Sequence, residues 1–152
     1  MTRSKRMDPV LRVAEHRERD AARALGESRQ RLEHQRQRLQ ELLDYREEYS
    51  RRFQETAGGG MDMNKLHEYR AFLGRLNDAV DHQHRSIAKA EAEVDRRHRD
   101  WLELCTRLRS LDTVRERFRR DERQADERRE QRDQDERVSA AAARPRDDGD
   151  DT

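Results

Sequence analysis

Two stretches of this chain carry apolar residues at steps of three, four or seven, and three consecutive glycines separate the stretches. Such spacing keeps apolar side chains on one narrow stripe of an α-helix, which can be buried only against another stripe. Because the break at Gly58–Gly60 is flexible, the nearest partner for each stripe is the other arm of the same chain. The stripes comprise Leu11, Ala14, Ala21, Leu25, Leu32, Leu39, Leu42, Tyr49 and Phe53, and then Leu66, Tyr69, Leu73, Leu76, Val80, Ile87, Ala90, Val94, Trp101, Leu104, Leu108, Leu111 and Phe118.

The fold class predicted from these stripes is all-α, a long two-helix antiparallel coiled-coil hairpin. Composition supports this, because a chain of 152 residues that is 31% hydrophobic and 45% charged has too few apolar groups for a globular core. The 35 basic and 34 acidic residues leave a formal net charge of +1. Disordered chains more often carry a net charge and lack an apolar period. The scarce apolar residues stand where a coiled coil needs them.

The ends of the helices follow from capping and breaking residues. Asp8 followed by Pro9 is typical of a helix start, and no further proline occurs before Pro145. Residues 1–137 are therefore expected to form a single hairpin. Its parts are a helix over about residues 8–54, a Gly-rich turn over about 55–62 and a second helix over about 63–137, and a disordered tail over 138–152 follows.

Polar residues within the stripes suggest how the two arms align. The register that we favour places Glu18 opposite Arg97, which joins unlike charges. It also places Arg46 over the ring of Tyr69. Sliding one arm by a heptad would instead bury Glu18 and Arg97 against leucines.

Enzymatic chemistry is not expected. No two of the six histidines stand four residues apart, and the triple glycine is not followed by Lys-Ser/Thr, so neither a helical metal site nor a phosphate loop is predicted. A two-helix rod offers no concave pocket that would tune carboxylates. We expect no catalytic residue, no cofactor and no metal.

Neither nucleic acid nor a membrane is expected to bind the chain directly. Arginine greatly outnumbers lysine, but the arginines alternate with carboxylates rather than forming a basic patch. No apolar run approaches the roughly 20 residues that a bilayer requires, so no direct membrane insertion is expected. Cys105 is the one cysteine, which excludes an intrachain disulfide and fits a reducing cytoplasm.

Two groups of apolar residues remain after the hairpin is built. Tyr45, Phe72 and Ala79 stand beside the stripes, and Tyr45 and Phe72 lie at similar distances from the glycine break on opposite arms. With Leu42, Tyr49 and Leu76 they would form an apolar, aromatic patch near the tip, which either shields the seam or docks a protein.

The second group lies at the open end of the hairpin and consists of Leu108, Leu111, Val114 and Phe118. In the favoured register these residues largely overhang the first helix. They would then insert into a partner, unless Met7 and the residues before it cover them.

With these features the chain resembles the FliJ family, the small coiled-coil component of the bacterial flagellar type III export apparatus. The resemblance covers about residues 8–137. It rests on the hairpin break and on three strings, Leu11-Arg12-Val13-Ala14, Tyr45-Arg46-Glu47-Glu48-Tyr49 and Leu66-His67-Glu68-Tyr69-Arg70-Ala71-Phe72-Leu73.

The resemblance implies a hairpin similar to the central stalk of rotary ATPases, at the cytoplasmic face of the inner membrane. The implied partners are the flagellar export ATPase hexamer, the export-gate membrane protein and substrate-specific export chaperones. Arg38 stands where the family can have Gln, and the charged C-terminal helix is the usual ATPase- and escort-binding region. The residues that match the family's gate-binding surface are Leu42, Tyr45, Tyr49, Phe72, Leu76, Ala79 and Gln83.

Two other functions remain open from the sequence. One is the equivalent stalk of a virulence type III secretion system, although the Tyr-x-x-Phe-Leu string at Tyr69 favours the flagellar system. The other is a passive self-associating coiled-coil scaffold, which would have no need of the aromatic patch beside the seam.

Overall fold

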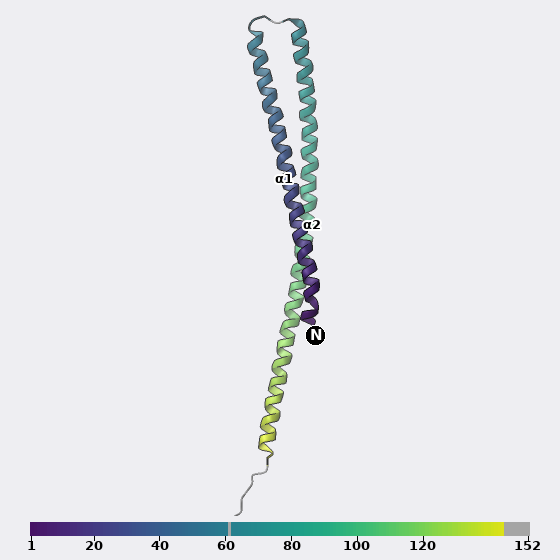
Figure 1. The fold of residues 1–152 in the computed structure, drawn as a ribbon, viewed down its shortest axis with the longest axis vertical. Coiled ribbons are helices and arrows are strands. Elements are labelled where there is room, and N and C mark those ends of the chain that lie inside the picture. Colours follow the sequence, from purple (N-terminus) through teal and green to yellow (C-terminus); the bar gives the residue numbers. More distant parts are fainter. Residues whose placement is uncertain (61, 145–152) are drawn as a thin grey trace, which may run out of the picture. The chain divides into compact units, whose positions relative to one another are not determined.

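The computed structural model describes residues 1–60 and 62–144. They form two helices, α1 over Arg3–Ala57 and α2 over Met63–Ala142, and the described residues include no strand (Figure 1). The all-α prediction is confirmed. Tertiary contacts divide the chain into a hairpin unit, His16–Cys105, and a terminal unit that joins Met1–Glu15 to Thr106–Thr152.

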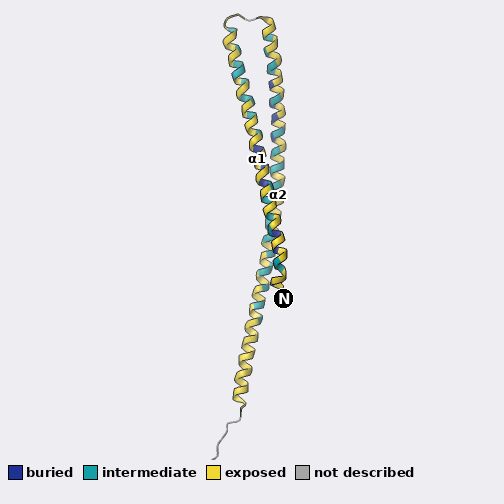
Figure 2. Cartoon of the chain, in the orientation of Figure 1, coloured by how far each residue is buried: buried dark blue, intermediate teal, exposed yellow. Residues whose placement is uncertain are grey.

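The core of the hairpin unit is a seam between the two antiparallel arms. Leu25 and Leu32 of α1 and Leu76, Val80 and Ile87 of α2 are buried, and all five stand at predicted stripe positions. Figure 2 shows buried and half-buried residues along the facing sides of the arms, with exposed residues elsewhere. The two-helix hairpin expected from the heptad spacing is therefore present in this unit.

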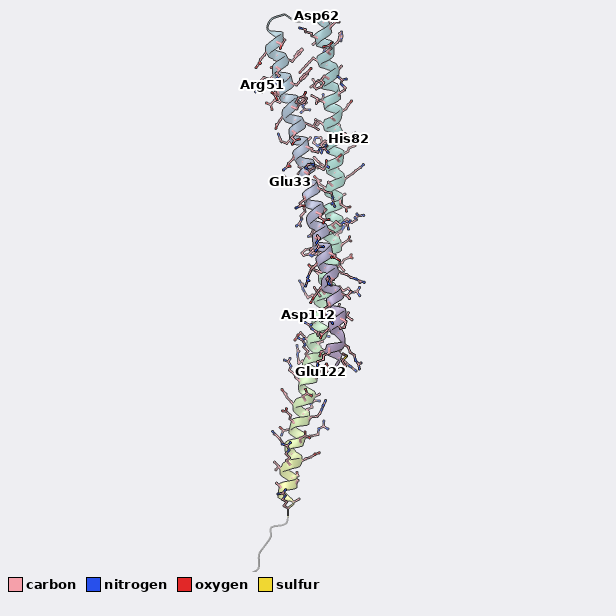
Figure 3. All side chains as sticks on the ribbon, viewed as in Figure 1. Glu33, Arg51, Asp62, His82, Asp112 and Glu122 are labelled. Carbon is pink, nitrogen blue, oxygen red and sulfur yellow. The ribbon has the colours of Figure 1, made fainter. Side chains whose placement is uncertain are left out.

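The turn closes at the triple glycine. The amide of Gly59 donates to the carbonyl of Thr56, the amide of Gly60 donates to that of Ala57, and Gly60 adopts a φ of 91° that favours glycine. Asp62, labelled at the turn in Figure 3, accepts a hydrogen bond from the amide of Asn64 at the start of α2. The second helix thus begins at Met63, as the sequence indicated.

The polar side chains of Gln83 and Ser28, which are buried in the seam, form hydrogen bonds there. The Nε2 of Gln83 donates to the main-chain carbonyl of Gln35 at 2.8 Å and to its side-chain oxygen at 2.7 Å. The hydroxyl of Ser28 donates to the carbonyl of Leu25 at 2.7 Å. Because a buried polar group without a partner is costly, these bonds let the seam keep its polar positions.

The favoured register is wrong. Glu18 accepts a hydrogen bond from the indole nitrogen of Trp101 at 2.9 Å, while Arg97 donates to Glu93 of its own helix at 2.8 Å. The indole N–H of a half-buried tryptophan needs an acceptor. Arg97 finds a carboxylate four residues away without reaching across the seam.

The tip shows the same displacement. Tyr69 stacks on Phe53, with ring centroids 3.6 Å apart, and Arg46 instead donates to the side-chain oxygen of Asn77. Phe53 opposite Tyr69 is the pairing that the heptad slide produces. The stacked rings are therefore found in the register that is displaced by one heptad from the one that charge pairing favours.

The first helix begins earlier than predicted, at Arg3 rather than near residue 8. Thr2 caps it, since its hydroxyl accepts from the amide of Lys5 and its carbonyl accepts from the amide of Arg6. Glu122 of α2 adds a second cap by accepting from both the amide and the hydroxyl of Ser4, at 3.0 and 2.7 Å. Pro9 consequently lies inside α1, where a proline costs roughly 3 kcal/mol.

The second helix also runs further than predicted. It extends through Ala142, so residues 138–142 are helical rather than part of a tail. Alanine has the highest helix propensity, which accounts for the extension through the Ala-rich run. The rest of the predicted tail, residues 145–152, lies outside the described residues.

Candidate functional site

Five aromatic rings from both arms form a cluster next to the turn of the hairpin unit, here called the tip cluster. Its members are Tyr45, Tyr49, Phe53, Tyr69 and Phe72. The centroid distances are 3.6 Å for Phe53–Tyr69, 5.5 Å for Tyr49–Tyr69, 4.3 Å for Tyr49–Phe72, 6.0 Å for Tyr45–Phe72 and 6.5 Å for Tyr45–Tyr49. The edge-to-face pair of Tyr45 with Phe72 has the geometry in which aromatic rings attract one another beyond simple area burial. The cluster therefore holds the two arms together near the glycine break.

Polar groups frame the cluster. The hydroxyl of Tyr69 donates to the hydroxyl of Ser50 at 3.2 Å, and the guanidinium of Arg75 lies 5.8 Å from the centre of the Phe72 ring. A cation over a ring face is favourable even at an exposed site. One hydrogen bond and one cation thus hold the rings of Tyr69 and Phe72 in place.

The rings of the cluster differ in exposure. Tyr45 is 50% exposed, whereas Tyr49, Phe53, Tyr69 and Phe72 are half-buried. The tyrosine hydroxyl suits water and its ring suits apolar contact, so Tyr45 can stand half-exposed at the edge of the cluster. The other four rings mainly fill the space between the arms.

The residues matched to the family's gate-binding surface fall into three groups. Tyr45, Tyr49 and Phe72 come together, as the sequence indicated. Leu42 and Ala79 are half-buried and line one shallow hollow between the arms together with Gln83. Leu76, 8% exposed, and Gln83, 7% exposed, belong to the seam itself.

Sequence reasoning missed Phe53 and Tyr69 as members of this cluster. Both were assigned only to the stripes. The signal that could have found them is the concentration of aromatic residues within a few helical turns of the break on both arms.

At the open end, the four apolar residues of α2 do not overhang the first helix. Leu108, Leu111, Val114 and Phe118 are half-buried in the terminal unit, which also contains the start of α1. The expected overhang is wrong because α1 begins at Arg3, and the guanidinium of Arg3 lies over the ring of Phe118.

Three polar contacts join the start of α1 to this part of α2. The guanidinium of Arg3 lies 5.8 Å from the centre of the Phe118 ring, Asp8 and Arg115 form an ion pair at 3.6 Å, and Glu122 caps Ser4. Figure 3 shows Glu122 on α2 beside the start of α1. The two hydrogen bonds from Ser4 lower the pKa of the Glu122 carboxyl below its ordinary value.

Over residues 126–142 the described part of the terminal unit is a stretch of α2 without a partner helix. Residues 126–144 are exposed on every side and form local pairs such as Arg129 with Asp126. A helix that is polar all round is stabilised by such pairs rather than by a core. This extension therefore offers charge, but no apolar stripe, to a partner.

The described residues hold no group of three or more histidine, cysteine, aspartate or glutamate side chains placed to bind a metal ion. Within the same residues, neither helix contains an apolar stretch long enough to cross a bilayer. Cys105 is a free, half-buried thiol.

The fold and these surfaces define a small coiled-coil protein built around a two-helix hairpin. The sequence profile of the family described as Flagellar FliJ protein matches residues 3–147. The Flagellar FliJ protein of Salmonella typhi is 28% identical over 138 residues, which cover 91% of this chain and 94% of the relative. The Flagellar FliJ protein of Escherichia coli K12 is 30% identical over 132 residues, 87% of this chain and 90% of the relative. The chain belongs to the flagellar FliJ family.

We predict that the rings of the tip cluster contribute unequally to stability. Tyr49→Ala and Phe72→Ala should each lower the free energy of unfolding by about 2 kcal/mol, because each removes a half-buried ring that contacts other rings. Tyr45→Ala should cost less than about 1 kcal/mol, because half of Tyr45 already faces water. Urea unfolding followed by circular dichroism measures all three. Equal losses would contradict the division into packing rings and one exposed ring.

Proposed function

We propose that this protein is a component of flagellar type III protein export, in which it links the hexameric export ATPase to the export gate as a central stalk and escorts export chaperones. The support is the family match across residues 3–147 and the two relatives named Flagellar FliJ protein. The flagellar names favour this reading over a virulence secretion stalk.

In this proposal the tip cluster binds the export-gate membrane protein. The observation that carries it is the ring of Tyr45, which is 50% exposed and 6.0 Å from Phe72 of the other arm. An aromatic side chain kept in water beside other aromatic residues is typical of a binding hot spot. Leu42 and Ala79 in the neighbouring hollow would extend the contact, whereas Leu76 and Gln83 would support it from the seam.

The gate contact is tested with Tyr45→Ala. The variant should weaken binding to the purified cytoplasmic part of the export gate at least tenfold and reduce swimming motility, because binding hot spots are worth more than about 1.4 kcal/mol. Helicity should stay unchanged. The matched control is Met63→Ala, which removes an apolar side chain that is 63% exposed near the turn but outside the cluster. If Tyr45→Ala binds the export gate with wild-type affinity, the tip cluster is not part of the gate contact.

The contact with the ATPase ring is proposed for the terminal unit. The exposed extension of α2, residues 126–142, offers alternating charges for the first contact. The stripe of Leu108, Leu111, Val114 and Phe118 would supply the apolar part of the contact. Charged residues guide encounter, while buried apolar groups contribute most of the affinity, so both parts have a role in this proposal.

The ATPase contact is tested by shortening α2. A chain that stops after Ala125 retains Glu122 and should stay folded, but it should bind the ATPase ring more weakly and stimulate ATP hydrolysis less. A chain that stops after Arg137 is the control and should behave like the full chain, because it keeps most of the charged extension. Full binding by the shorter chain would exclude the extension over residues 126–142 from the ATPase contact.

A further inference from the structure

We propose that the start of α1, Arg3–Asp8, is a releasable strap that covers the apolar stripe of α2 in the terminal unit, and that Glu122 is the latch that holds the strap closed. The strap would then occupy, within the same chain, a surface that otherwise fits a partner helix. Its role in masking the ATPase contact rests on the proposed function, whereas the opening of the strap does not.

The strap adds little apolar burial of its own. Among residues 3–8, Met7 is the one large apolar side chain, and it is half-buried. Beyond Pro9 the situation differs, because Leu11 is 2% exposed and Ala14 is 6% exposed. The hydrophobic effect therefore holds α1 against α2 from Leu11 onward, whereas the segment before Pro9 is held mainly by polar contacts.

Pro9 marks the place where the strap can separate from the rest of α1. Proline has no amide hydrogen, so Pro9 cannot donate to the carbonyl of Lys5 as a helical residue would. Its ring also crowds that carbonyl. The helix is thus weakened between the strap and the buried residues that follow.

The latch is the strongest of the contacts that hold the strap. The Glu122 carboxylate accepts from the amide of Ser4 at 3.0 Å and from its hydroxyl at 2.7 Å. It lies at the N-terminal end of α1, where the helix dipole favours a negative charge. The remaining contacts, Arg3 over Phe118 and Asp8 with Arg115, are partly exposed and individually weak.

The closed strap also leaves one polar group unsatisfied. The Nε of Arg115 is buried without a hydrogen-bond partner, although the same guanidinium reaches Asp8 and Asp112. A buried donor without a partner is unfavourable. When the strap opens, Asp8 leaves and water can reach Arg115. Hydration of its Nε would offset part of the free energy that is lost with the hydrogen bonds between Glu122 and Ser4.

Opening the strap would uncover Val114 and Phe118 and free the carboxylate of Glu122. The surface then suits the first turns of a partner helix with a cationic residue at its start and an apolar residue one turn later, since Arg3 and Met7 supply that chemistry now. A helix of the ATPase ring with this pattern would compete with the strap.

The proposal is tested by amide hydrogen exchange on the full chain. Glu122→Gln should raise exchange in residues 4–8 about tenfold, because the charge-assisted bonds to Ser4 are weakened. Pro9→Ala should lower exchange in the same residues, because the helix gains a hydrogen bond. The matched control is Glu130→Gln, which changes an exposed carboxyl on the same helix, and exchange around Leu76–Ile87 should not change in any variant. Unchanged exchange of residues 4–8 in both Glu122→Gln and Pro9→Ala would refute the strap.

The masking role is tested by measuring binding of the same variants to the ATPase ring. Glu122→Gln should bind several-fold more tightly than wild type, and Pro9→Ala several-fold more weakly. If hydrogen exchange responds to the substitutions as expected while the affinity for the ATPase ring stays the same, the masking role is overturned and the proposed function stands. If the wild type itself does not bind the ring, the proposed function fails, and the exchange result alone decides whether the strap exists.

Discussion

Burial of a narrow apolar stripe on each arm is the interaction on which the rest of this structure depends. In a chain that is 45% charged, Leu25, Leu32 and their partners on α2 are among the few groups that leave water. Each fully buried side chain of this kind contributes about 1.5–3 kcal/mol relative to exposure. The seam also absorbs polar residues, because Gln83 and Ser28 satisfy their hydrogen bonds within it.

The seam explains why the aromatic residues meet at the tip. Antiparallel arms joined by a short turn bring together residues that lie equally far from the break, so Tyr49 of α1 contacts Tyr69 and Phe72 of α2. Four rings fill the space between the arms and leave Tyr45 half-exposed. The same cluster thus joins the two arms and keeps one aromatic ring in contact with water.

The sequence predicted the two helices, their turn and the meeting of Tyr45 with Phe72, but not the register, the outer helix ends or the arrangement at the open end. Apolar period and the triple glycine determine the hairpin, and distance from the break brings Tyr45 to Phe72. Two registers that differ by one heptad bury almost the same number of apolar residues. The contacts that distinguish them are the hydrogen bond from Trp101 to Glu18 and the stacking of Phe53 on Tyr69. Asp8-Pro9 resembles a helix start, whereas α1 is capped by Thr2 and by Glu122, which is distant in sequence.

The central claim is that each stripe is buried against the other arm of the same chain. The most direct test is the midpoint of thermal unfolding, followed by circular dichroism, over about a 100-fold range of protein concentration. Burial within one chain predicts a midpoint that does not change with concentration. A midpoint that rises steadily with concentration would show that the stripes are buried between chains, and it would contradict the account.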